Sequence, residues 1–161
     1  MAMSTLLQAV SDQEINELRR DPGRVNRLNA AVSFSTYHAA SINYFVTGSA
    51  YPAATDHPLW PMLDGAEILA CATLETGEFG LVPPEVADQV ATLLASVDVA
   101  SVAAMVERAD IENLVDDEEL YDLELLDRTK APTAIADAIG ELVVFYSQVA
   151  IGKLGVVTFA A

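Results

Sequence analysis

Residues 132–159 read PTAIADAIGELVVFYSQVAIGKLGVVTF, and this stretch decides the fold. Pro132 suits the first turn of a helix, where a backbone N–H is not needed. Apolar residues then recur at spacings of four, three, four and three, the inward stripe of a core helix: Ile135, Ile139, Leu142, Tyr146 and Val149. Gly152 ends this helix, and the β-branched and aromatic residues after it predict a buried strand.

The opposite end of the chain predicts a second strand. Thr5–Val10 is short, apolar and followed by a helix start, although a buried helix has the same pattern at this length. Ser11 and Glu14 form a capping box, which predicts a helix over Asp12–Arg20. We expect the two terminal strands to lie side by side in one sheet, because a single short strand must find partners for its backbone groups.

Three further helices are indicated between these ends. Pro83 or Pro84 opens one of them, with apolar residues at the helical period: Val86, Val90, Leu93, Leu94 and Val97. Another, rich in alanine and valine, is expected over Val99–Arg108. A third is predicted to open at Ser35 and to end at Gly48.

The middle of the chain is less regular. One short helical turn fits between Pro58 and Gly65, and residues 68–73 are apolar enough for a strand. Gly77 and Gly80 are interpreted as breaks in regular structure. We therefore predict a single compact α+β domain over residues 1–161, mostly helical, with a small sheet that includes both terminal strands.

Charge restricts the partners of the chain. It carries 24 acidic and 8 basic residues, a formal charge of −16. Such a field repels phosphate backbones and anionic membrane surfaces, so neither nucleic acid nor a membrane is an expected partner. A basic protein would be attracted instead. Acidic side chains also keep proteins soluble, and this alternative interpretation stays open.

The charge is also segregated along the chain. Residues 107–127 contain ten acids against Arg108 alone, with leucine and valine interleaved, which favours an ordered amphipathic segment. Four arginines gather instead at residues 19–27, where they could hold an anion or neutralise nearby acids. We expect a basic partner to contact four consecutive acids: Asp116, Asp117, Glu118 and Glu119.

Signals for secretion, metal binding and catalysis are missing from the sequence. The N-terminus lacks a basic region, and Cys71 has no second cysteine to pair with, so we expect a cytoplasmic protein. His38, His57 and Cys71 do not have the short paired spacing of zinc sites. His38 is interpreted as half-buried and Cys71 as an inert, buried thiol. No catalytic residue, metal or cofactor is predicted.

Aromatic residues around a proline-rich loop suggest a pocket. Tyr51, His57 and Trp60 lie in or beside this loop, and Tyr44 precedes it. Because loops carry function more often than core segments do, these four residues are the candidate rim of a small-ligand pocket. Simple packing of the loop would produce the same composition.

Several short motifs occur in an order typical of one family. They are Met1-x-Met3, YFVTG at residues 44–48, PL at 58–59, VPPEV at 82–86 and FYSQVAIG at 145–152. Together they resemble the YfbM-like family, the domain of unknown function numbered 1877. The resemblance implies a compact α+β fold and no established reaction.

The chain departs from that family at several polar positions. The usual Asp-Lys-x-Trp run and the usual His-Tyr pair are replaced, at positions that hold Thr36, Tyr37, Ala39 and Asn43-Tyr44. The usual Ile-Tyr-Pro segment reads Leu120-Tyr121-Asp122. Tyr44, Thr47 and Gly48 are the residues that carry over.

Two functional hypotheses follow. The first is a non-catalytic acidic binding protein that neutralises a basic partner, as an immunity protein blocks the nucleic-acid-binding surface of a toxin. The second is a small-ligand-binding protein or enzyme with a pocket near Tyr44, Tyr51, His57 and Trp60. The missing catalytic motifs favour the first. The sequence leaves the oligomeric state open.

Overall fold

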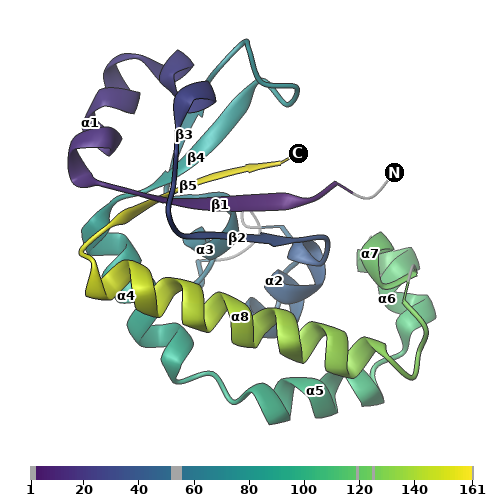
Figure 1. The fold of residues 1–161 in the computed structure, drawn as a ribbon. Coiled ribbons are helices and arrows are strands. Elements are labelled where there is room, and N and C mark those ends of the chain that lie inside the picture. The colour runs from purple at the N-terminus through teal and green to yellow at the C-terminus, as the bar shows by residue number, and fades with distance from the viewer. Residues whose placement is uncertain (1–2, 52–55, 119, 125, 161) are drawn as a thin grey trace.

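A five-stranded antiparallel sheet lies at the centre of the computed structural model, which describes residues 3–51, 56–118, 120–124 and 126–160. The strand order is β2-β1-β5-β4-β3 (Figure 1). The strands are β1 (Thr5–Val10), β2 (Ser33–Thr36), β3 (Glu67–Ala70), β4 (Glu78–Val82) and β5 (Gly155–Ala160). The fold is therefore α+β, as predicted.

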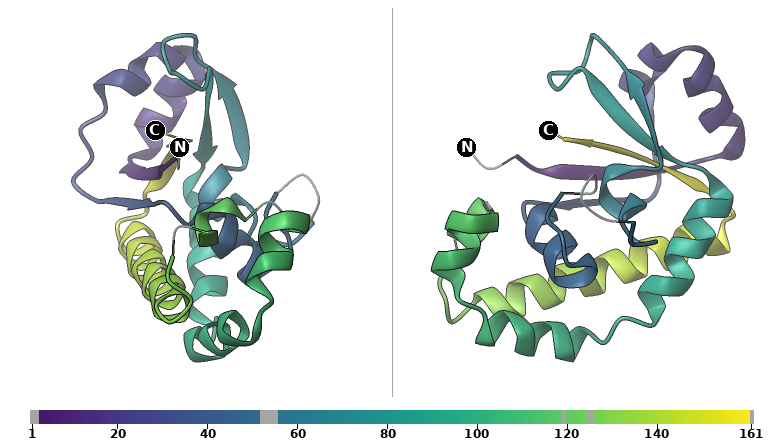
Figure 2. Two further views of the ribbon diagram at one scale, coloured as in Figure 1. Left: turned by 90° about the vertical axis from the view of Figure 1, so that its right-hand side faces the viewer. Right: turned by 180° about the vertical axis from the view of Figure 1, so that it is seen from behind.

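Helices cover both faces of this sheet (Figure 2). They are α1 (Asp12–Arg20), the 3-10 helix η1 (Pro22–Arg27), α2 (Ala39–Thr47), α3 (Pro61–Asp64), α4 (Pro84–Ala95), α5 (Val99–Arg108), α6 (Ile111–Glu118), α7 (Tyr121–Glu124) and α8 (Ala131–Ile151). Helix α1 and η1 lie over one face, and α2, α4, α5 and α8 lie over the other. The helices predicted over residues 12–20 and 99–108 are confirmed, as is the one opened by Pro84.

The two terminal strands are neighbours, which confirms the prediction for the chain ends. Strand β1 pairs with β5 along its whole length, from Thr5 opposite Ala160 to Val10 opposite Gly155. Strand β1 lies between β2 and β5, and β5 lies between β1 and β4. The first and last strands of the chain thus form the middle of the sheet.

Alternation along the strands produces two hydrophobic cores. Successive residues of a strand point to opposite faces, so Val156 joins the core under α8 and Val157 joins the core under α1. In the larger core, all five residues of the predicted α8 stripe have 0% exposure. The smaller core contains Ile15 and Leu18 of α1.

Helix α8 is long and apolar enough, by length and composition, to cross a membrane. In the fold, its predicted stripe packs against the sheet and against α4 and α5. Its other face carries the exposed Asp137 and Glu141. This two-sided distribution is the amphipathic pattern of a core helix.

The prediction of a helix from Ser35 was wrong. Ser33–Thr36 is strand β2, with Ser33 and Ser35 exposed and Phe34 and Thr36 buried. That period of two, together with the pairing of Phe34 with Leu7 of β1, outweighs the helical spacing that begins in the same stretch. The helix starts at Ala39 and ends, as predicted, at Gly48, which has a φ of 86°.

Strand β4 was not predicted, because its glycine was interpreted as a break. A Cβ at Gly80 would collide with Thr158 Oγ1 and with the carbonyl oxygen of Asp64. Gly80 therefore allows β5 and the end of α3 to approach the strand closely. The strand expected over residues 68–73 is β3, which ends at Ala70, before a turn stabilised by the Cys71 N–H donating to the Gly77 carbonyl at 2.8 Å.

Candidate functional site

Helices α6 and α7 form an acidic lobe at one end of the molecule (Figures 1 and 2). Leu120 and Leu123 anchor the lobe, with exposures of 0% and 1% in the larger core. On α6, Leu114 and Val115 are partly buried against the same core. The inner side of the lobe is therefore apolar, and its polar residues are left on the outside.

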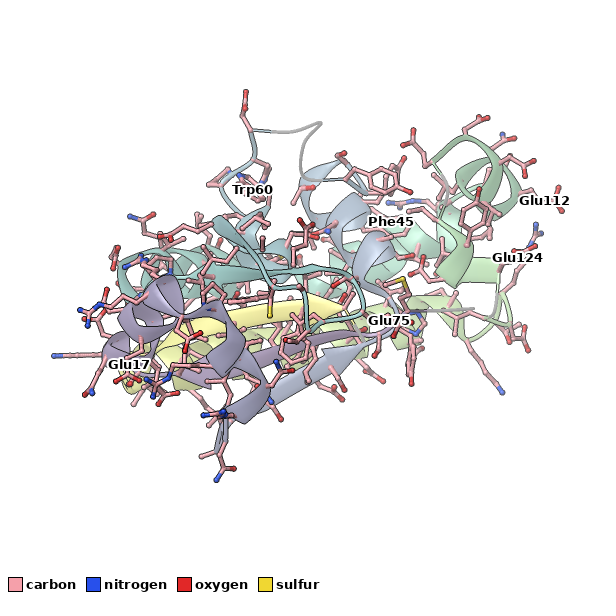
Figure 3. All side chains as sticks on the ribbon, turned by 90° about the horizontal axis from the view of Figure 1, so that it is seen from above. Glu17, Phe45, Trp60, Glu75, Glu112 and Glu124 are labelled. Carbon is pink, nitrogen blue, oxygen red and sulfur yellow. The ribbon has the colours of Figure 1, made fainter. Side chains whose placement is uncertain are left out.

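Acidic side chains cover the outside of this lobe. Of the ten acids between residues 107 and 127, Glu119 lies outside the described residues, Asp122 is partly buried and the other eight are exposed. Asp116, Asp117 and Glu118 have no ion-pair partner among the described residues. Figure 3 shows Glu112 and Glu124 of the lobe at the end of the molecule opposite Glu17 of α1.

Two of the four arginines at that opposite end are paired with acids. Arg19 Nε donates to Glu67 Oε2 at 3.0 Å, and Arg24 Nη2 lies 2.9 Å from Glu17 Oε2. For these two arginines, the interpretation as neutralising partners of nearby acids is confirmed. The arginines at that end therefore lie beside acids, whereas Asp116, Asp117 and Glu118 of the lobe have no ion-pair partner among the described residues.

A groove of about 370 Å³ adjoins the acidic lobe. It runs between α2, α5 and α6, and its apolar lining includes Tyr44, Met105 and Leu114. Met105 is 44% exposed. Asp110 and Asn113 of the loop and helix beside it supply polar groups at the rim. Arg108 also lines it, so the result is an apolar recess with one acid and one base at its rim.

The four predicted rim residues lie on different segments. Tyr44 lines the groove between α2, α5 and α6, whereas Tyr51 is exposed after the end of α2. His57 and Trp60 precede α3, and His57 Nδ1 accepts a hydrogen bond from the Leu59 N–H at 3.1 Å. The Trp60 N–H donates to the His57 carbonyl at 3.0 Å. His57 thus makes a local contact that forms a turn. The groove at Tyr44 is completed by helices α5 and α6.

A set of buried polar contacts holds α3 between α2 and α8. Asn43 Nδ2 donates to Asp64 Oδ2 at 3.0 Å, and the Tyr146 hydroxyl donates to the Met62 carbonyl at 2.7 Å. Burial raises the pKa of the Asp64 carboxyl, and the bond from Asn43 opposes this shift. Burial, and then the charge of Asp64, raise the pKa of Tyr146. The periodicity of α8 predicted the burial of Tyr146, but the sequence contained no signal for its bond to Met62 or for the bond between Asn43 and Asp64.

His38 and Asp122 connect the acidic lobe to the start of α2. His38 Nδ1 lies 3.7 Å from Asp122 Oδ2, and both side chains are largely buried. Neither group has a hydrogen-bond partner in the described part of the chain. His38 is half-buried, as predicted. This contact positions α7 against the start of α2.

Side chains able to bind a metal are dispersed over the fold. Within the described ranges, no three His, Cys, Asp or Glu side chains come together to hold a metal ion. Cys71 is buried, as predicted, with its Sγ 3.1 Å from Thr73 Oγ1. Of the predicted site residues, Tyr44 lines the groove beside the acidic lobe, and Asp116, Asp117 and Glu118 lie on the lobe itself.

No protein-family model and no curated protein matches the chain. Among solved structures, the crystal structure of YfbM from Escherichia coli, described as a protein of unknown function, has a TM-score of 0.70 over 99% of both chains. The chain has the YfbM fold. The sequence identity is 15%, so the comparison establishes the fold and leaves the function open.

The residues shared with the YfbM-like pattern divide between structure and surface. Thr47 Oγ1 donates to the Asn43 carbonyl at 2.7 Å, and Gly48 adopts the left-handed conformation that ends α2. Both therefore serve the YfbM fold as a helix end. Tyr44, the third shared residue, lines the groove beside the acidic lobe.

Proposed function

We propose that the chain is a non-catalytic binding protein whose acidic lobe docks on a basic surface of a partner protein, in the manner of an immunity protein. One observation carries this proposal. Asp116, Asp117 and Glu118 are adjacent, exposed and without an ion-pair partner among the described residues. Carboxylates left in this state are available to lysine and arginine side chains from another molecule.

The neighbouring groove offers an apolar contact, which charge alone does not provide. Interfaces combine an apolar centre with a polar rim, and the groove at Tyr44 and Met105 lies beside the acids of α6. A partner of matching chemistry carries an apolar side chain surrounded by lysine or arginine. The apolar contact would slow dissociation, and the charges would act mainly on encounter.

The position of the lobe acids at one end of the molecule also favours one orientation of approach. The unpaired acids lie at the end of the molecule opposite the arginines of α1 and η1. A basic partner is therefore attracted more strongly toward the lobe than toward the other end, where Arg19 and Arg24 pair with acids. The attraction should weaken as salt is added, since the Debye length is about 8 Å at physiological ionic strength.

Charge reversal tests the proposal. The triple variant Asp116→Lys, Asp117→Lys and Glu118→Lys should associate with the natural partner roughly tenfold more slowly, because the steering field is inverted. A matched control, Glu75→Lys, Glu78→Lys and Asp88→Lys, makes the same charge change at exposed positions away from the lobe. It should associate much like the wild type.

To identify the partner, the wild type, the lobe variant and the control each serve as bait in native lysate, and the proteins that each bait retains are compared. The relevant protein is basic, is retained by the wild type and the control, and is lost by the lobe variant. Its association rate is then measured at several salt concentrations by surface plasmon resonance. An association rate that changes neither with the charge reversal nor with added salt would refute the proposal, provided circular dichroism shows that the lobe variant is folded.

A further inference from the structure

A second and larger groove, of about 720 Å³, lies between strand β2 and helix α8. Ser33 and Ser35 line it on the strand side, and Gly140 and Val144 line it on the helix side. Strand β2 is at the end of the strand order and runs beside α8 (Figure 1). We name this feature the β2–α8 groove. It is separate from the groove at Tyr44.

The strand side of the groove presents backbone groups that pair with no other strand in the described part of the chain. The Ala9 N–H donates to the Val32 carbonyl at 3.0 Å, which extends the register that sets Leu7 opposite Phe34. In an antiparallel ladder, alternate residues direct both backbone groups to the same neighbour. Val32 and Phe34 therefore face β1, and Ser33 and Ser35 direct their N–H and C=O groups to the free edge.

The helix side of the groove contains a glycine that the fold itself does not require. Gly140 lies inside the 21-residue helix α8, where glycine is less stable than alanine by about 0.5–1 kcal/mol. A Cβ at this position would have no atom within 4 Å. Gly140 thus leaves open space over the helix, enough for another backbone to approach. Val144, one turn later, is 58% exposed.

Charge on the helix identifies the kind of occupant. Asp137 and Glu141 both line the groove and are exposed. Neither has an ion-pair partner in the part of the chain that the structure describes. A segment with lysine or arginine would therefore match this side of the groove.

We propose that the β2–α8 groove binds an extended basic segment of a partner protein, which adds to the free edge of β2 as a sixth strand. The outward backbone groups of Ser33 and Ser35 offer two donors and two acceptors to this strand. Side chains on its inner face lie over Gly140 and Val144, and a lysine or arginine lies between Asp137 and Glu141. Strand addition of this kind derives affinity from the main chain and specificity from alternate side chains.

The first experiment uses a phage-displayed library of random twelve-residue peptides selected on the wild-type chain. Enriched peptides should carry lysine or arginine among apolar residues, and binding should protect the Ser33 and Ser35 amides from hydrogen exchange. Enrichment of no peptide, or of peptides that leave these two amides unprotected, would overturn the proposal.

The second experiment fills the open space on α8. Gly140→Leu should weaken binding of the selected peptide roughly tenfold or more, while its melting temperature does not fall, because leucine is the better helix former. The control Ser147→Leu adds the same side chain to an exposed α8 position that does not line the groove. It should leave peptide affinity unchanged. Equal affinity for the wild type and Gly140→Leu would refute the proposed site.

Two further measurements distinguish the β2–α8 groove from the acidic lobe and from a dimer interface. The reversal of Asp116, Asp117 and Glu118 should leave peptide affinity unchanged, because these residues lie on the acidic lobe and not in the β2–α8 groove. Light scattering should give the same molecular mass for the wild type and for the Gly140→Leu variant. A dimer that this substitution dissociates would assign the groove to a second copy of the chain and would overturn the proposal.

Discussion

Single residues in the larger core are held by polar contacts as well as by packing. The Tyr146 hydroxyl reaches the Met62 carbonyl at the end of a ring that is otherwise surrounded by apolar side chains. Asp64 accepts from Asn43 in the same region. Such groups are costly to bury without partners, so each bond sets the position of the residue that makes it.

Tyr146→Phe tests the first of these bonds. The substitution keeps the ring but leaves the Met62 carbonyl without its donor, and this should lower the free energy of unfolding by about 1–3 kcal/mol. Urea unfolding would measure the change. Tyr121→Phe, at a side chain that is 59% exposed, is the matched control and should change little. A loss below about 0.5 kcal/mol for Tyr146→Phe would mean that the carbonyl finds another donor.

The Asp64 carboxyl should make the stability depend on pH. Its folded pKa is raised above the unfolded value of about 3.9, so between these two values the folded chain holds more protons than the unfolded chain. The contribution of Asp64 is therefore most favourable below its unfolded pKa and is lost as the pH rises through its folded pKa.

Asp64→Asn removes this ionisation. Compared with the wild type, the variant should gain relative stability between about pH 4 and about pH 7, because the wild type alone must ionise a buried carboxyl. Urea unfolding of both proteins at the two pH values measures the difference. The exposed Asp88→Asn serves as the control. A stability difference that is the same at both pH values would contradict the argument.

At the scale of the elements, helix α8 dominates the packing. It contacts α4, α5 and β2, and its buried stripe is the centre of the larger core. Its exposed side carries the residues of the β2–α8 groove. One helix thus supplies the core with one face and a candidate binding surface with the other.

Leu142→Ala tests the buried face of α8. Leu142 has 0% exposure, and its truncation should cost about 2–5 kcal/mol through lost burial and the cavity that remains. Val144→Ala, two residues later on the exposed side, should cost less than about 1 kcal/mol. Denaturant unfolding of the pair compares the two faces directly. Similar losses for both variants would show that the faces are wrongly assigned.

At the scale of the whole molecule, the proposed function rests on the distribution of charge. The net charge of −16 is far from neutral, and α6 carries three adjacent exposed acids that have no ion-pair partner among the described residues. The proposed docking of the acidic lobe depends on this long-range field. Strand addition at β2 depends on short-range backbone contacts. The two proposed surfaces should therefore respond differently to salt, with the lobe the more sensitive of the two.

The sequence by itself determined the elements whose signals are local. The spacing of α8, the Ser11 cap of α1, the proline at the start of α4 and Gly48 at the end of α2 were all predicted correctly. The family motifs led to the right fold, and the apolar terminal strands led to the right pairing. Such signals can be interpreted from neighbouring residues, because capping and helical packing depend on spacings of three and four residues.

The tertiary structure decided what depends on residues distant in the sequence. In the sequence, Gly80 resembles a turn signal, but in the structure it makes room for Thr158 and Asp64 beside strand β4. Ser33–Thr36 is a strand because it pairs with β1. The grooves and the burial of Asp64 likewise form only when separate helices and strands meet. The sequence pattern around Tyr51 and His57 could not show that α5 and α6 would complete the groove at Tyr44. Contacts between residues distant in the sequence produce no periodic sequence pattern, because the residues that make them lie on different elements.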